Sequence, residues 1–189
     1  MLNRTVRALA PLSLLAAVAV AGGLTLSSPA AAQNEEDAVL NKLDAGWTFY
    51  GLRNPAKMVR DEGVQGGRAY KVSVSKGSNA WSVGANTTMA KPVKKGHRIA
   101  IAFWAKASKV EEGETGRLEY FAVERNAEPR TQVVSGSADL GPEWKLVQAS
   151  GIAPQDFAAS ELVVTVHLAA RRQTLELGPV AVLDMGPAS

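Results

Sequence analysis

Short apolar segments, each ended by Gly, Pro, Asn or Asp, recur along the chain from residue 47 to residue 184. Segments of this kind, separated by turn residues, are typical of β-strands. We predict strands at residues 47–50, 57–61, 68–75, 82–89, 98–107, 117–125, 131–134, 145–150, 161–169, 174–177 and 180–184. Because no amphipathic helix accompanies these segments, the pattern predicts an all-β sandwich or barrel.

Alternation within three predicted strands, residues 98–107, 117–125 and 161–169, indicates which side chains face the core. In each strand a set of large apolar residues alternates with a mixed set. Since successive side chains of a strand point to opposite faces, the apolar set belongs in the core and the mixed set on the outer face of its sheet. The outward sets contain Trp104, Tyr120, Glu124 and His167.

The first 32 residues have the features of a cleavable secretory signal peptide. Arg4 and Arg7 precede an apolar run at residues 8–26, and alanines at residues 30–32 form a cleavage signal. A membrane anchor is the alternative, because about 19 apolar residues just span a bilayer. Pro and Gly interrupt this run, however, and no basic cluster follows it. We expect cleavage after residue 32 and a periplasmic or secreted protein with no membrane span after cleavage.

The part that follows the signal peptide, 157 of the 189 residues, has the size of one domain. We expect an acidic tail at residues 33–42 and one β-sandwich at residues 43–186. Loss of Arg4 and Arg7 leaves 19 basic against 18 acidic residues, a balance that gives no reason to expect nucleic acid as a partner. The sequence has no cysteine, which excludes disulfides and thiolate metal sites.

Motifs for catalysis and metal binding are missing from the sequence. The two histidines lack the spacing of a zinc site, and there is no nucleophile elbow, phosphate-binding glycine loop or dinucleotide fingerprint. The paired carboxylates of a glycosidase are the remaining enzymatic alternative, but most acidic residues fall at turns or at exposed strand positions. We therefore predict that the protein is not an enzyme and uses no cofactor or metal.

Exposed aromatic residues beside polar side chains indicate sugar binding, because a pyranose stacks its apolar face on a ring while its hydroxyls bond to polar groups. The candidate ligand-binding residues are Trp81, Trp104, Tyr120, Glu124 and His167. The structural alternative is that a loop or the N-terminal strand covers Trp104 and that Trp81 closes a sandwich edge. Trp47 and Trp144, which open strands next to turns, are assigned to the fold.

Seven landmarks in the sequence form a recognisable series. They are GWTFYG at residues 46–51, GGRAYKV at 66–72, NAW at 79–81, VKKGH at 93–97, FWAKA at 103–107, EWK at 143–145 and QTLELG at 173–178. In order and spacing, this series resembles the jelly-roll carbohydrate-binding modules of families four, nine and twenty-two. The resemblance covers residues 43–184.

This resemblance implies a two-sheet β-sandwich jelly roll, galactose-binding-domain-like, that binds β-glycans in a groove on its concave sheet without cleaving them. It implies that Trp81 and Tyr120 stack on sugars and that Glu124 and His167 supply polar groups of the groove. Many members of these families hold a structural calcium through an acidic residue in the last strands. Gly178 occupies that position here, so no metal is expected.

Three functions remain open on this reading. The first is an exported non-catalytic module that binds poly- or oligosaccharide, which is the function that we predict. The second is an envelope protein-interaction domain with the same fold and no glycan ligand. The third is a small glycan-processing enzyme. Aromatic residues lining a groove favour the first, a flat apolar patch the second, and two acids facing each other across a cleft the third.

Overall fold

In the computed structural model of the chain, residues 38–188 are described. The predicted signal peptide and the first half of the predicted acidic tail, residues 33–37, lie outside these residues. The described part is built almost entirely from strands, which are β1 (Thr48–Tyr50), β2 (Lys57–Arg60), β3 (Arg68–Val74), β4 (Gly84–Thr88), β5 (His97–Val110), β6 (Gly116–Arg125), β7 (Gln132–Leu140), β8 (Lys145–Ile152), β9 (Leu162–His167) and β10 (Gln173–Pro187). Two short 3-10 helices, η2 (Gln65–Gly67) and η3 (Ala80–Ser82), interrupt the connections.

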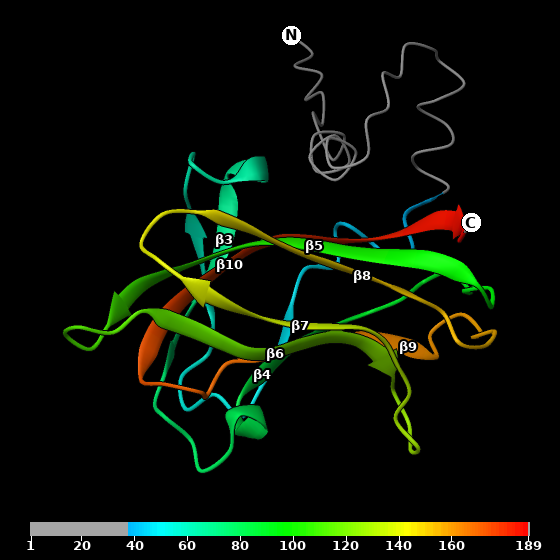
Figure 1. Ribbon diagram of the computed structural model, residues 1–189. Coiled ribbons are helices and arrows are strands. Elements are labelled where there is room, and N and C mark those ends of the chain that lie inside the picture. Colours follow the sequence, from blue (N-terminus) through cyan, green and yellow to red (C-terminus); the bar gives the residue numbers. More distant parts are fainter. Residues whose placement is uncertain (1–37, 189) are drawn as a thin grey trace, which may run out of the picture.

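The strands form two antiparallel sheets that pack face to face as two layers (Figure 1). The first sheet has the order β1-β4-β9-β6-β7, and the second has the order β2-β3-β10-β5-β8. This arrangement confirms the predicted all-β jelly-roll sandwich. No helix within residues 38–188 has both the length and the apolar character that a bilayer crossing requires.

The core lies between the two sheets and consists of the apolar sets that alternation predicts. Phe103 on β5 and Phe121 on β6 are both buried, and their rings meet edge to face across the sandwich at 5.4 Å. Trp47 packs against Phe103 at 5.7 Å and donates its indole N–H to the carbonyl oxygen of Gly178, at 2.8 Å. The assignment of Trp47 to the fold is therefore confirmed.

The last two predicted strands, residues 174–177 and 180–184, are one strand, β10. Its register against β5 shifts between Leu177 and Val180, so Gly178 and Pro179 bend the pairing without ending it. The indole of Trp47 satisfies the Gly178 carbonyl at this irregularity, so the bend leaves that buried acceptor with a partner. β10 lies in the middle of the second sheet, between β3 and β5.

Residues 39–41, placed in the tail by the sequence, pack on the sandwich. Val39 forms a bridge with Leu183, and the backbone N–H of Leu40 donates to the carbonyl of Val182 at 2.8 Å. The Asn41 side chain accepts the N–H of Val182 at 2.7 Å and donates to the carbonyl of Val180 at 3.1 Å. This short segment thus takes the place beside the second half of β10 that β3 takes beside the first half.

Candidate functional site

The outer face of the first sheet carries a row of side chains set by strand pairing. In the register of the sheet, Tyr50 on β1 lies opposite Gly84 on β4, Gly84 opposite His167 on β9, and His167 opposite Tyr120 on β6. All four residues point away from the core, because a neighbour of each in sequence belongs to the core or packs against it, namely Phe49, Ala85, Val166 and Phe121. Four strands thus place three rings and one glycine side by side on one face.

Ring contacts link His167 of this row to Tyr120 and to Trp81. The imidazole of His167 lies 4.7 Å from the ring of Tyr120 at an interplanar angle of 31°, and 6.3 Å from the ring of Trp81. Trp81 comes from η3, just before β4, and its side chain is 59% exposed. A Cβ added to Gly84 would overlap the phenol ring of Tyr50, so the ring of Tyr50 lies directly over this glycine. The result is an open aromatic surface.

A polar cluster adjoins the rings and is centred on Glu124. Its carboxylate is nearly buried, and accepts one hydrogen bond from the Tyr120 hydroxyl at 2.7 Å and another from the Arg130 guanidinium at 2.8 Å. The side-chain amide of Gln132 donates to the Tyr120 hydroxyl at 2.9 Å. Such a network fixes the orientation of each member, and it leaves the half-exposed guanidinium with further N–H groups to offer to a ligand.

Burial and the charges of Glu124 and Arg130 shift the pKa values of the titratable rings in this site. Burial, the hydrogen bond to Glu124 and the charge of that carboxylate raise the pKa of Tyr120 far above its usual value. Burial also raises the pKa of Tyr50, on which Arg130 and Glu124 act in opposite directions. The pKa of His167 is lowered, mainly by burial. At neutral pH the rings of the row are therefore uncharged.

Asn86 adds an acceptor to the floor of this face. It lies on β4 two residues beyond Gly84 and pairs with Thr48 on one side and Thr165 on the other. Its side-chain oxygen is buried and has no hydrogen-bond partner within residues 38–188. Buried acceptors are nearly always satisfied, so this oxygen is suited to accept a hydrogen bond from a bound ligand or an ordered water.

Four of the five candidate residues come together in this site, namely Trp81, Tyr120, Glu124 and His167. Sequence reasoning did not select four further members, which are Tyr50, Asn86, Arg130 and Gln132. Tyr50 follows the core-facing Phe49, so alternation does indicate that it faces outward. Arg130 and Gln132 lie at the turn into β7, where no periodic pattern marks them.

Trp104 does not lie in this site: it faces outward, as alternation predicts, but on the other sheet, which corrects its grouping with the other four candidates. Its strand, β5, pairs with β10 and β8 and not with β6, so its outer face is that of the second sheet. There Trp104 is half-buried, and its indole N–H donates to the side-chain oxygen of Gln65 at 3.4 Å. Residues near η2 thus cover it, as the structural alternative proposed.

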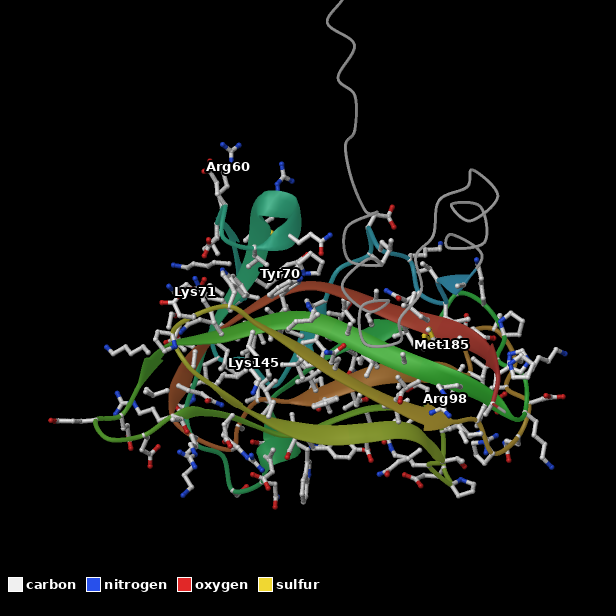
Figure 2. The ribbon with its side chains drawn as sticks, turned by 45° about the horizontal axis from the view of Figure 1, so that its top comes forward. Arg60, Tyr70, Lys71, Arg98, Lys145 and Met185 are labelled. Carbon is white, nitrogen blue, oxygen red and sulfur yellow. The ribbon has the colours of Figure 1, made fainter. Side chains whose placement is uncertain are left out.

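Trp144 lies on the same outer face as Trp104, in a cluster of charged side chains. Its indole N–H donates to Asp61 at 3.1 Å, and the ammonium of Lys106 lies 4.6 Å from its ring centre. Lys106 also pairs with Asp61 at 2.6 Å. These contacts join the β2–β3 region to β5 and to the start of β8 on a face that also carries Lys71, which pairs with Glu176 (Figure 2). Trp144 is half-buried, which makes it part of the fold but not of the core.

No group of three or more His, Asp or Glu side chains within residues 38–188 is placed to hold a metal ion. The position of Gly178 is filled by its neighbours, since an added Cβ would crowd the side chains of Val64 and Trp104.

A β-sandwich that presents rings and hydrogen-bonding groups on one open sheet face has the build of a ligand-binding module. The family model described as a carbohydrate-binding domain matches residues 36–173, and the chain belongs to this family. Its members are typically non-catalytic. None of the curated proteins matches the sequence significantly.

Solved structures with the same fold include several carbohydrate-binding modules. A family 4 module shares 23% identity at a TM-score of 0.57, over 74% of this chain and 95% of that one. The N-terminal cellulose-binding domain of the Cellulomonas fimi β-1,4-glucanase C shares 23% identity at a TM-score of 0.55, over 76% and 91%. The Clostridium thermocellum xylanase 10B, as a two-module chain complexed with xylohexaose, shares 16% identity at a TM-score of 0.57, over 79% of this chain and 29% of that one.

Proposed function

We propose that the protein is an exported, non-catalytic module that binds a poly- or oligosaccharide on the outer face of the first sheet. The observation that carries this proposal is the open row of rings beside the Glu124–Arg130 pair. The faces of Trp81 and Tyr120 offer stacking surfaces for pyranose rings. Arg130, Glu124 and the unpartnered oxygen of Asn86 offer donors and acceptors for the sugar hydroxyls.

The arrangement of charges favours binding over hydrolysis. Glycosidases require two carboxyl groups on either side of the scissile bond, one of them able to donate a proton. In the described site Glu124 is the central acid, and both its oxygens are held by Tyr120 and Arg130. The polar groups beside the rings also distinguish this face from the flat apolar patch that a protein-interaction domain would use.

Calorimetry and affinity electrophoresis of the purified protein against xylan, mixed-linkage glucan, pectin and alginate test the proposal. We expect Trp81→Ala to weaken binding at least tenfold, about 1.4 kcal/mol, because a stacked ring is lost. Met58→Ala is the matched control, since Met58 is 52% exposed but lies on β2 of the second sheet. The assignment of sugar binding to this sheet face fails if none of the four glycans binds, or if Trp81→Ala and Met58→Ala weaken binding equally.

Export is tested separately by the intact mass of the protein recovered from the periplasm or the medium. We expect a chain that begins close to residue 33, as the cleavage signal at residues 30–32 indicates. Recovery of the full-length chain in the membrane fraction would contradict this part of the proposal and would leave the sugar-binding part untouched.

A further inference from the structure

A pocket of about 770 Å³ lies at one end of the second sheet, apart from the aromatic row. Residues 51–54 of the β1–β2 connection and the end of β3 line it. The end of β5 and the start of β10, which pair with each other, line it as well. Ligand sites in proteins commonly enclose about 300–1,000 Å³. The pocket is therefore large enough for a sugar residue with a charged substituent.

Four cationic side chains line this pocket, and they are Arg53, Lys76, Lys109 and Arg172. Glu111 is the one acidic residue among those that line it. Within residues 38–188, none of the four cations forms an ion pair, whereas the adjacent Arg171 pairs with Glu114 at 3.7 Å. Unpaired charges of one sign around a concave surface raise the local concentration of anions.

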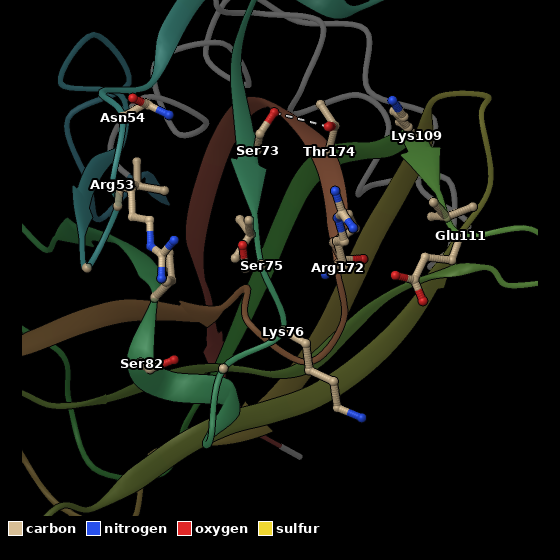
Figure 3. A pocket seen from close by; sticks show the side chains of 17 residues that line it. Arg53, Asn54, Ser73, Ser75, Lys76, Ser82, Lys109, Glu111, Arg172 and Thr174 are labelled. Atoms are coloured by element: carbon tan, nitrogen blue, oxygen red, sulfur yellow. Dashed lines mark hydrogen bonds between the residues drawn. The ribbon is translucent and has the colours of Figure 1, made fainter.

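Hydroxyl groups lie among these charges. The side chains of Ser73 and Thr174 share a hydrogen bond of 3.1 Å. Ser75, two residues after Ser73 and just beyond the end of β3, also lines the pocket. In the view of Figure 3, Arg53 and Arg172 lie on opposite sides of the strand that carries these serines. A planar guanidinium binds a carboxylate through two parallel hydrogen bonds, and hydroxyls serve as donors and acceptors for sugar hydroxyls.

The pocket and the aromatic row share one loop. Ser82 lines the pocket, while Trp81, its neighbour in η3, contacts the ring of His167 on the first sheet. Gly77 permits the close approach of Ser82, because a Cβ at residue 77 would overlap the hydroxyl of Ser82. A polymer on the outer face of the first sheet that passes η3 therefore comes within reach of the cationic pocket.

We propose that this pocket is a second binding site, which takes the carboxylate-bearing uronate residues of an acidic glycan. The choice of a glycan as the occupant rests on the proposed function, whereas the preference for an anion rests on the four unpaired cations. The two claims are separable, because neutral sugars need only the aromatic row and uronates need Arg53 and Arg172.

The test titrates the purified protein with hexagalacturonate and, in parallel, with xylohexaose as an uncharged oligosaccharide. We expect the double variant Arg53→Gln/Arg172→Gln to lose affinity for hexagalacturonate by about tenfold or more and to keep its affinity for xylohexaose. The matched control is Arg60→Gln/Arg98→Gln, which removes the same charge from exposed positions that do not line the pocket. We expect this control to change the affinity for hexagalacturonate by less than about twofold, since exposed charges beyond a Debye length are screened.

Three results of these titrations would overturn the second site. They are no binding of hexagalacturonate, equal losses in the two double variants, or displacement of hexagalacturonate by inorganic phosphate at equal concentration, which would indicate a simple anion site. Trp81→Ala separates the two proposals. If Trp81→Ala abolishes xylohexaose binding, and the two double variants still differ in their affinity for hexagalacturonate, both proposals stand. If Trp81→Ala abolishes hexagalacturonate binding as well, the acidic glycan occupies the aromatic row and the pocket assignment is wrong.

Discussion

The hydroxyl of Tyr120 donates a 2.7 Å hydrogen bond to Glu124, four residues further along the same strand. Both side chains stand on the outer face of β6, and Glu124 is only 4% exposed. The second carboxylate oxygen is held by Arg130. The Tyr120 ring is therefore fixed in its contact with His167 before any ligand arrives, which reduces the conformational entropy that binding costs.

Replacement of Tyr120 by Phe removes this hydrogen bond and keeps the ring. We expect Tyr120→Phe to lower the free energy of unfolding by about 1–2 kcal/mol, since Glu124 and Gln132 each lose a partner. Urea denaturation of Tyr120→Phe, Glu124→Gln and the double variant measures the coupling. We expect the two losses to be less than additive. Strictly additive losses would show that the two residues do not act together.

His167 gives the site a pH dependence with a defined sign. Burial lowers its pKa below the ordinary value near 6.5, so the unfolded chain takes up a proton before the folded one as the pH falls. The neutral imidazole thus contributes stability that is present above about pH 6.5 and is lost as the pH falls from there through the folded pKa. An NMR titration, with the signal assigned through its loss in His167→Gln, should give a midpoint below 6.5. In His167→Gln this part of the acid destabilisation should vanish, and a midpoint above 6.5 would contradict the prediction.

Gly84 leaves space for the ring of Tyr50, so replacement of Gly84 tests how much the position of that ring contributes to glycan affinity. We expect Gly84→Ala to push the phenol aside at a cost in stability below about 1 kcal/mol, because Tyr50 is exposed and can rotate. Glycan affinity should fall as far as it does in Tyr50→Ala. The double variant Tyr50→Ala/Gly84→Ala should bind no more weakly than Tyr50→Ala alone, which calorimetry can decide. A further loss in the double variant would mean that Gly84 acts through something other than Tyr50.

Replacement of Trp104, which lies outside the site, should change the stability of the protein and not its glycan affinity. Because it is half-buried on the second sheet, we expect Trp104→Ala to lower the free energy of unfolding by about 2 kcal/mol, less than the roughly 3–5 kcal/mol of a fully buried tryptophan. Its glycan affinity per folded molecule should equal that of the wild type. Thermal melting and calorimetry on the same samples separate the two quantities. A loss of affinity without a loss of stability would return Trp104 to the binding site.

The sequence predicts which way a side chain points more reliably than it predicts which side chains meet. Alternation depends only on the pleat of one strand, so it correctly turns Tyr120, His167 and Trp104 outward. A sandwich, however, has two outer faces, and alternation does not say which sheet a strand joins. That choice depends on pairings between residues far apart in the chain, and it separates Trp104 from Tyr120.

Other features escape the sequence for local reasons. Gly178 and Pro179 are typical of the end of a strand, yet β10 continues through them, and a residue 131 positions earlier, Trp47, bonds the Gly178 carbonyl. Residues 39–41 are too few to show any period, and their place depends on hydrogen bonds to β10. Arg130 joins the site from a hairpin, where neither alternation nor a motif distinguishes it from a solvated arginine.

The central place of β10 also dictates when the protein can fold. Translation delivers β10 after the other nine strands, although β3, β5 and residues 39–41 all need it as a partner. Until the ribosome has released this strand, the second sheet is divided into two unconnected pairs, and its inner face has no closed layer to cover the first sheet. A chain whose native contacts are this distant in sequence folds slowly. The complete sandwich therefore cannot form before residues 173–187 have emerged from the ribosome.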